Sequence, residues 1–159
     1  YISVTGVQTC ALPIYSAGGH LAAMLLSCRW KQVDAALPPQ IVCGGLAVSG
    51  LFDLEPLRHT PFLQADLQLT PTSVARLSPA FFPRPRATRL FAVVGGDESE
   101  EFVRQNRLIR EVWGPSAVPV CETVSAANHF TVLNALADPQ TRLHRLALRL
   151  LGLEGVREP

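Results

Sequence analysis

Apolar runs and amphipathic segments alternate along most of this chain. Residues 41–49 form a nearly unbroken apolar run, as in a strand buried on both faces of a parallel sheet, and residues 89–94 predict a second buried strand. Residues 118–124 predict a third strand. Apolar residues recur at helical spacing in three further segments: residues 18–30, 100–113 and 139–151. Helices that alternate with buried strands predict an α/β fold, in which a parallel sheet is flanked by helices on both faces.

The spacing also predicts which helix faces are buried. Apolar residues at intervals of three and four mark the buried side of the first and last helices: Leu21, Met24, Leu25 and Cys28 in the first, and Leu143, Leu146 and Leu150 in the last. A short helix near residues 131–137 is expected before the last one. We therefore expect both of the longer helices to pack on the sheet through these side chains.

Residues 51–85 interrupt the alternation. Six prolines in this stretch exclude long regular elements, and the pattern leaves room for one short helix near residues 72–76. An earlier connection, residues 31–40, is polar and also contains proline. We expect the proline-rich stretch to form an excursion from the sheet that shapes a pocket.

Ser16 stands at the start of the first predicted helix and is followed by small residues. A nucleophilic serine on a tight strand-to-helix turn needs small neighbours on both sides, which gives the pattern Gly-x-Ser-x-Gly. Ala17, Gly18 and Gly19 satisfy the downstream half, whereas the upstream glycine position holds the β-branched Ile14. A serine before a helix can also be a simple N-cap, but the run of small residues favours a nucleophile.

Asp97 and His129 follow Ser16 in the chain order that typifies one class of serine hydrolase. Each of the three comes after a predicted strand, so all would meet at the carboxyl edge of a parallel sheet. A serine hydroxyl needs a base within hydrogen-bond reach, and the base needs a carboxylate that fixes its tautomer. Asp97 lies in a run of acids that could equally begin a solvated helix, and Glu98 is the substitute for it.

Three other histidines compete with His129 for the role of base. We expect His20 to pack or hydrogen-bond near the site and His144 to lie on the surface of the last helix, while His59 stays open as a pocket residue. His129 is preferred because it follows the last predicted strand closely.

The first fourteen residues do not read as a native strand. The run from Val4 to Ile14 resembles the conceptual translation of a sequencing adapter that continues into the reading frame. We interpret residues 1–14 as a non-native segment, residues 15–152 as the carboxyl-terminal portion of one domain, and residues 153–159 as a tail. A divergent but genuine amino-terminal strand is the alternative.

The composition fits part of a globular enzyme and disfavours some partners. The 14 basic and 13 acidic residues give a formal charge of +1, so neither nucleic acid nor a membrane surface is an expected partner. The four cysteines, Cys10, Cys28, Cys43 and Cys121, lack the paired short spacing of a metal or redox site. These features favour a cytoplasmic protein with a small-molecule substrate.

Five short segments stand out together: Ser16-Ala17-Gly18-Gly19-His20, the Ser-Gly-Leu-Phe-Asp-Leu-Glu-Pro-Leu run of residues 49–57, Leu77-Ser78-Pro79, the Val-Gly-Gly-Asp-Glu-Ser run of residues 94–99, and Asn128-His129-Phe130. They resemble the α/β-hydrolases, and within them the kynurenine formamidase (arylformamidase) and hormone-sensitive-lipase-like esterase branch. The resemblance implies a partial α/β-hydrolase fold that starts at the nucleophile turn and lacks the amino-terminal strands.

The resemblance also implies an activity. It points to a serine hydrolase with Ser16, Asp97 and His129 as the triad and the backbone N–H of Ala17 as an oxyanion donor, without a metal or an organic cofactor. The expected reaction is cleavage of an arylformamide such as N-formylkynurenine or of a carboxylic ester. A general lipase-like carboxylesterase and a non-catalytic binding module are the alternatives.

Two expectations concern the pocket and the completeness of the site. Four apolar residues are candidates for the substrate pocket, with ordinary core packing as the other interpretation: Phe52, Leu57, Phe62 and Phe130. Family members take a second oxyanion donor from an upstream His-Gly-Gly loop that this sequence lacks, and loss of such a donor lowers turnover by about 10²–10³-fold. We therefore expect an impaired chain and an active parent protein, for which a homodimer is one option.

Overall fold

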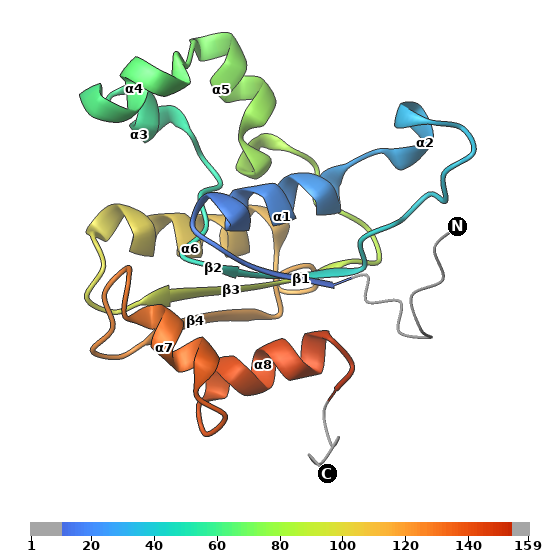
Figure 1. Ribbon diagram of the computed structural model, residues 1–159. Coiled ribbons are helices and arrows are strands. Elements are labelled where there is room, and N and C mark those ends of the chain that lie inside the picture. The colour runs from blue at the N-terminus through green and yellow to red at the C-terminus, as the bar shows by residue number, and fades with distance from the viewer. Residues whose placement is uncertain (1–10, 154–159) are drawn as a thin grey trace.

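The computed structural model describes residues 11–153, and at their centre lies a sheet of four parallel strands (Figure 1). The strands follow one another across the sheet in chain order: β1 (Ala11–Tyr15), β2 (Gly44–Val48), β3 (Arg89–Gly95) and β4 (Val120–Val124). The register pairs Tyr15 with Val48 and Val48 with Val93. The α/β class and the parallel sheet predicted from the sequence are confirmed.

Helices cover both faces of this sheet (Figure 1). On one face lie α1 (Ala17–Ser27) and α6 (Glu100–Trp113), and on the other lie α7 (Val132–Ala137) and α8 (Arg142–Leu150). The remaining helical segments are α2 (Trp30–Val33), α3 (Glu55–Arg58), α4 (Pro61–Leu67), α5 (Pro71–Leu77) and the 3₁₀ turn η1 (Pro79–Phe81).

Side chains of alternating strand positions form two hydrophobic layers, one on each face of the sheet. The layer under α1 and α6 contains Ala47, Leu90, Ala92, Leu26, Ile109 and Trp113. The layer under α7 and α8 contains Leu46, Val48, Phe91, Val93, Leu143 and Leu146. β2 and most of β3 are buried on both sides, which explains why both appear in the sequence as continuous apolar runs.

The helix predicted at residues 100–113 has the bounds of α6. Glu100 and Glu101 lie in its first turn, where the helix dipole favours negative charge. Gly114 follows the last turn with φ 77°, a conformation that costs glycine little. Its length is therefore set by signals at both ends that the sequence displays.

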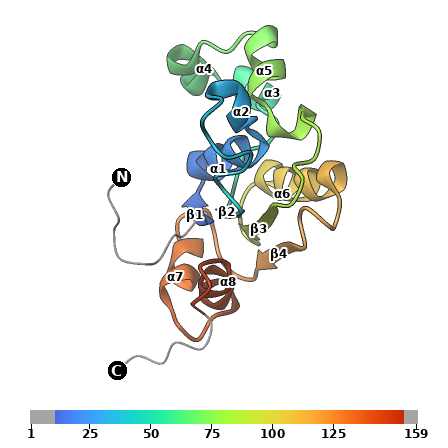
Figure 2. The same ribbon diagram turned by 90° about the vertical axis from the view of Figure 1, so that its right-hand side faces the viewer.

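The proline-rich excursion projects from the sheet, beyond α1 (Figure 2). Prolines begin α4 and α5 at the first helical position, where the missing N–H costs no hydrogen bond. The short helix expected near residues 72–76 corresponds to α5, while α3 and α4 are additional. A small cluster of Leu54, Leu69 and Val74 holds the three helices together.

The buried face of α1 differs from the prediction. Its buried residues are Gly19, Ala22, Ala23 and Leu26, whereas the expected Leu21 is 51% exposed. Small residues face the sheet because α1 packs very closely: a Cβ on Gly19 would lie 2.8 Å from the Cα of Gly50. The sequence pattern identified the large apolar residues but not the face that allows this close approach.

Part of the segment that we interpret as non-native, residues 1–14, forms a strand. Ala11–Tyr15 form β1 and pair in parallel with β2 over their whole length. Residues 1–10 and most of the predicted tail lie outside the described residues. The origin of the segment and the domain limits stay predictions.

Candidate active site

Three side chains meet at the carboxyl edge of the sheet. Ser16 follows β1 directly, Glu98 lies in the loop after β3, and His129 lies in the loop after β4. Parallel strands bring such loops to the same edge. The sheet thereby joins residues that are 113 and 31 positions apart in the chain.

Ser16 occupies a sharp turn between β1 and α1. Its backbone has φ 53° and ψ −120°, and its N–H donates to the carbonyl of Val48 at 2.8 Å. A non-glycine residue in this region is strained, and such strain is retained mostly at functional sites. The turn therefore has the geometry expected of a nucleophile elbow.

Ile14 stands where the upstream glycine was expected, and the structure accommodates it through Gly18. The side chain of Ile14 lies where a Cβ on Gly18 would have to be, so an alanine at 18 would overlap Ile14 Cγ2. Close packing at this elbow is achieved by the downstream glycine alone.

His129 connects Ser16 to a carboxylate. Its Nε2 lies 3.2 Å from Ser16 Oγ, and its Nδ1 lies 2.6 Å from Glu98 Oε2. An ionised carboxylate can only accept hydrogen bonds, so Nδ1 carries the proton and Nε2 is left to accept from the serine hydroxyl. This is the tautomer that a general base needs.

The carboxylate at His129 belongs to Glu98 and not to Asp97, the residue predicted for this position. Asp97 is exposed, and its backbone N–H donates to the carbonyl of Ala127 at 2.9 Å. The Glu98 side chain is 0% exposed. The end of β3 lies so close to the loop after β4 that a Cβ on Gly95 would overlap the Ala127 carbonyl. In this arrangement the side chain of Glu98, which is longer than that of Asp97, reaches His129.

Aromatic rings surround the imidazole of His129. The ring of Phe102 lies 4.3 Å from it between centroids, that of Tyr15 lies 4.8 Å away, and that of Phe130 lies 5.8 Å away at nearly a right angle. The Tyr15 hydroxyl also donates to the backbone carbonyl of His129 at 2.6 Å. Sequence reasoning missed Phe102 and the role of Tyr15, because neither belongs to a motif.

The electrostatics of the site are visible at Tyr15. Burial raises the pKa of its hydroxyl, and the nearby charge of Glu98 raises it further. Tyr15 therefore stays protonated and can keep donating its hydrogen bond through the neutral range of pH.

Ala17, the predicted oxyanion donor, follows Ser16 at the start of α1. It is the first residue of α1, so its N–H has no acceptor within the helix and points to the helix N-terminus, where negative charge is favoured. An oxygen that becomes negative beside Ser16 would lie at this end of the helix.

The four predicted pocket residues divide between core and surface. Phe52 is 0% exposed within the hydrophobic layer under α1 and α6, which favours the alternative interpretation of ordinary core packing. Leu57 packs against the small cluster of the excursion. Phe62 and Phe130 are 74% and 78% exposed, and Phe130 is the one that borders His129.

The other histidines make contacts that support the fold. His20 Nε2 lies 2.7 Å from the Leu77 carbonyl and links α1 to α5. His59 pairs with Glu55 within the excursion, and His144 Nδ1 lies 2.9 Å from the Leu136 carbonyl. His144, which was expected on the surface of the last helix, is half-buried and joins α8 to α7.

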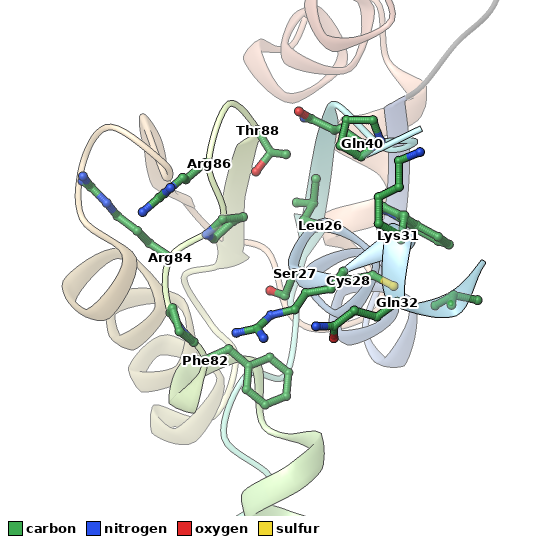
Figure 3. Close-up of a pocket in the computed structure, with 16 residues that line it drawn as sticks. Leu26, Ser27, Cys28, Lys31, Gln32, Gln40, Phe82, Arg84, Arg86 and Thr88 are labelled. Atoms are coloured by element: carbon green, nitrogen blue, oxygen red, sulfur yellow. The ribbon is translucent and has the colours of Figure 1, made fainter. Parts of the chain in front are cut away.

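One cavity bordered by described residues lies away from this site. It measures about 890 Å³ and is bordered by Leu26 at the end of α1, Gln40 before β2 and Thr88 before β3 (Figure 3). These residues mark the amino edge of the sheet, opposite the edge that carries Ser16. Residues 82–86 of the excursion do line this cavity, but they do not bring it to the catalytic side chains.

Two further observations concern metals and membranes. Within the described part of the chain, no group of three or more His, Cys, Asp or Glu side chains is arranged to hold a metal ion. Among the same residues, no helix combines the length and apolar character needed to cross a bilayer.

Known proteins resemble this chain in sequence. No protein-family model matches it. It is 31% identical over 158 residues to a kynurenine formamidase of Danio rerio and 30% identical over 159 residues to one of Salmo salar, and each match includes 96% of this chain. The chain spans about half of these curated relatives, 52% of the length of each.

Solved structures resemble it in fold. A candidate thioesterase from Silicibacter sp. TM1040 matches with a TM-score of 0.68 and 26% identity, over 85% of this chain and 48% of that one. An acetyl ester-xyloside bifunctional hydrolase from Caldicellulosiruptor lactoaceticus matches with a TM-score of 0.60 and 18% identity, over 89% and 56% of the two chains. Fold and sequence together show an α/β fold like that of solved hydrolases and a sequence similar to kynurenine formamidases.

Proposed function

We propose that this protein is a serine hydrolase in which Ser16 is the nucleophile, His129 the general base and Glu98 the carboxylate that orients the base. The observation that carries the proposal is the continuous contact from Ser16 Oγ to His129 Nε2 and from His129 Nδ1 to Glu98, at 3.2 and 2.6 Å. Serine, base and carboxylate are the parts that nucleophilic catalysis requires.

The reaction follows from these positions. Ser16 Oγ attacks the carbonyl carbon of the substrate while His129 accepts the hydroxyl proton, and the carbonyl oxygen becomes negative beside the Ala17 N–H. His129 then protonates the leaving amine or alcohol, which departs and leaves an acyl or formyl group on Ser16. Water, deprotonated by His129, attacks this ester and releases the acid, so that the serine is regenerated.

For the substrate we propose an arylformamide, with a carboxylic ester as the second candidate. The likeness to proteins named kynurenine formamidase supports the first. The exposed ring of Phe130 and the nearby rings of Tyr15 and Phe102 supply an apolar border that suits an aryl group. The ester remains a candidate because the same three side chains attack either carbonyl.

A labelling experiment tests the nucleophile. The purified chain is incubated with diisopropyl fluorophosphate and digested, and the modified peptide is identified by mass spectrometry. We expect the label on Ser16 and none in Ser16→Ala. Label on another residue, or no label on a folded chain, would contradict the proposal.

A second step separates the substrates. Initial rates on N-formylkynurenine and on 4-nitrophenyl acetate are compared, with Ser16→Ala as the blank for each. A higher kcat/KM for the formamide supports arylformamidase activity, and a higher value for the ester supports the second candidate. The impaired turnover expected from the sequence stays a prediction.

A further inference from the structure

Ser49 has no part in the reaction as described, yet it is built into the same edge of the sheet. It follows β2 as directly as Ser16 follows β1, and it has the same φ of 53°. Its N–H donates to the Val93 carbonyl at 2.7 Å, as that of Ser16 donates to Val48. Ser49 is 1% exposed, so its side chain is buried.

The hydroxyl of Ser49 donates to the carboxylate of Glu98. The distance from Ser49 Oγ to Glu98 Oε1 is 2.5 Å, which is typical of a hydrogen bond to a charged oxygen. The same Oε1 accepts the N–H of Gly95 at 2.7 Å. Oε2 is the atom that is hydrogen-bonded to His129 Nδ1, so the two oxygens of the carboxylate have different partners.

From this arrangement we propose that Ser49 is a positioning residue, which holds the Glu98 carboxylate so that Oε2 faces His129 Nδ1. The inference rests on the proposed function, since it extends the chain of contacts from Ser16 and His129 to a fourth side chain.

Physical reasons favour this role over simple core filling. A fully buried carboxylate needs donors to remain charged, and Ser49 and Gly95 supply two besides His129. Both donate to Oε1, and these two hydrogen bonds restrain rotation of the carboxyl group about its terminal bond. A serine with positive φ is strained, and alanine would fill this place as well if packing were its purpose.

The test compares two buried serines. Ser49→Ala removes the donor to Glu98, whereas Ser78→Ala removes a hydroxyl that accepts the N–H of Leu54 at 2.9 Å, in a residue that is 0% exposed. Both variants are assayed for the rate at which diisopropyl fluorophosphate modifies Ser16 and for the midpoint of urea unfolding. Ser49→Gly, which relieves the positive φ, serves as a second variant without the hydroxyl.

We expect Ser49→Ala and Ser49→Gly to slow the labelling of Ser16 by about 10- to 100-fold, the range that follows from losing one hydrogen bond to a charged group. Ser78→Ala should lower the urea midpoint while its labelling rate stays within about twofold of the unmodified chain. Labelling by both Ser49 variants at the unmodified rate would overturn the inference.

A spectroscopic measurement keeps the inference separate from the proposed function. The proton between His129 Nδ1 and Glu98 gives a far-downfield resonance in the NMR spectrum, which is assigned by its loss in His129→Gln. We expect Ser49→Ala to shift or remove this resonance and Ser78→Ala to leave it unchanged. If Ser16 is not labelled at all, the proposed function fails, while a resonance that responds to Ser49→Ala still supports the positioning role. A resonance that is absent from the unmodified chain, or indifferent to Ser49→Ala, overturns it.

Discussion

His129 is paired with Glu98 through a hydrogen bond of 2.6 Å, although Asp97 is the residue that directly follows Gly95 and Gly96 at the end of β3. The Glu98 side chain is wholly buried, whereas Asp97 is exposed. Two adjacent acids thus have very different surroundings, and their functional roles can be separated by experiment.

Glu98→Gln should slow the labelling of Ser16 far more than Asp97→Asn. The amide can offer its N–H₂ group to His129 and so favour the wrong tautomer of the imidazole, a change that costs roughly 10³–10⁴-fold where such a carboxylate is known to act. Asp97→Asn should leave the rate within about twofold, because surface substitutions away from such contacts have small effects. The measurement is the rate constant for modification by diisopropyl fluorophosphate in each variant.

If Asp97→Asn slowed labelling far more than Glu98→Gln, the role of the acid would belong to Asp97. Urea unfolding of both variants is the control, since a loss of folding would slow labelling without any change at the imidazole.

The choice between these acids shows what the sequence could and could not predict at the site. Chain order and position after strands were sufficient to select Ser16 and His129, because parallel strands bring their carboxyl ends together. The choice of acid depends on how the loop after β3 packs against Ala127, and this contact between distant loops leaves no local signal. Phe102 was missed for the same reason, since in sequence it is one more apolar residue of an amphipathic helix.

A similar limit applies to the fold. Periodicity predicted α6 with its bounds, because both ends carry their own signals. In α1 it selected Leu21 as a buried residue, whereas the close approach of Gly19 to Gly50 turns the small residues toward the sheet. Hydrophobicity scales with side-chain size, so a face of alanine and glycine that packs closely is underestimated by a pattern of large apolar residues.

Tyr15→Phe should destabilise the chain and slow the labelling of Ser16 modestly. The variant loses the hydrogen bond to the His129 carbonyl, which contributes about 1 kcal/mol in a typical case. Burial, with a smaller effect of Glu98, raises the pKa of Tyr15 from its ordinary value of 10.0. The folded chain therefore keeps this proton when the unfolded chain has lost it, so the contribution is present below pH 10 and declines as pH rises through the folded-state pKa.

Urea unfolding of both proteins from pH 7 to 11 checks this expectation. The difference in unfolding free energy should be constant up to about pH 10 and shrink above it. A difference that grows with pH would show that the hydroxyl is easier, not harder, to ionise in the folded state.

Gly18→Ala should destabilise the elbow despite the better helix propensity of alanine. The propensity gain is about 0.5–1 kcal/mol, whereas the new Cβ would overlap Ile14 Cγ2, and crowding of this kind costs about 1–3 kcal/mol. The double variant Ile14→Ala with Gly18→Ala should recover part of the loss, because it removes the overlapping methyl groups. Urea midpoints of the two single variants and the double variant measure this coupling, and additive effects would contradict the overlap.

Glu122→Gln should reduce the acid sensitivity of the chain. Glu122 on β4 accepts two hydrogen bonds from Arg142, the first residue of α8, at 2.5 and 2.6 Å. The hydrogen bonds from Arg142 hold the pKa of Glu122 below its ordinary value of 4.5. A carboxylate with a lowered folded-state pKa stabilises the fold above its unfolded pKa, and this contribution is lost as pH falls through the folded-state pKa.

The difference in stability between the original chain and Glu122→Gln should therefore be present at pH 7, and it should be small because Arg142 is 65% exposed. It should decline as pH falls below about 4.5, while Glu111→Gln, at an exposed glutamate of α6, should show no such change. Thermal unfolding from pH 3 to 7 measures both differences, and a Glu122 effect that persists unchanged at pH 3 would mean that packing of the side chain, and not its charge, attaches α8 to the sheet.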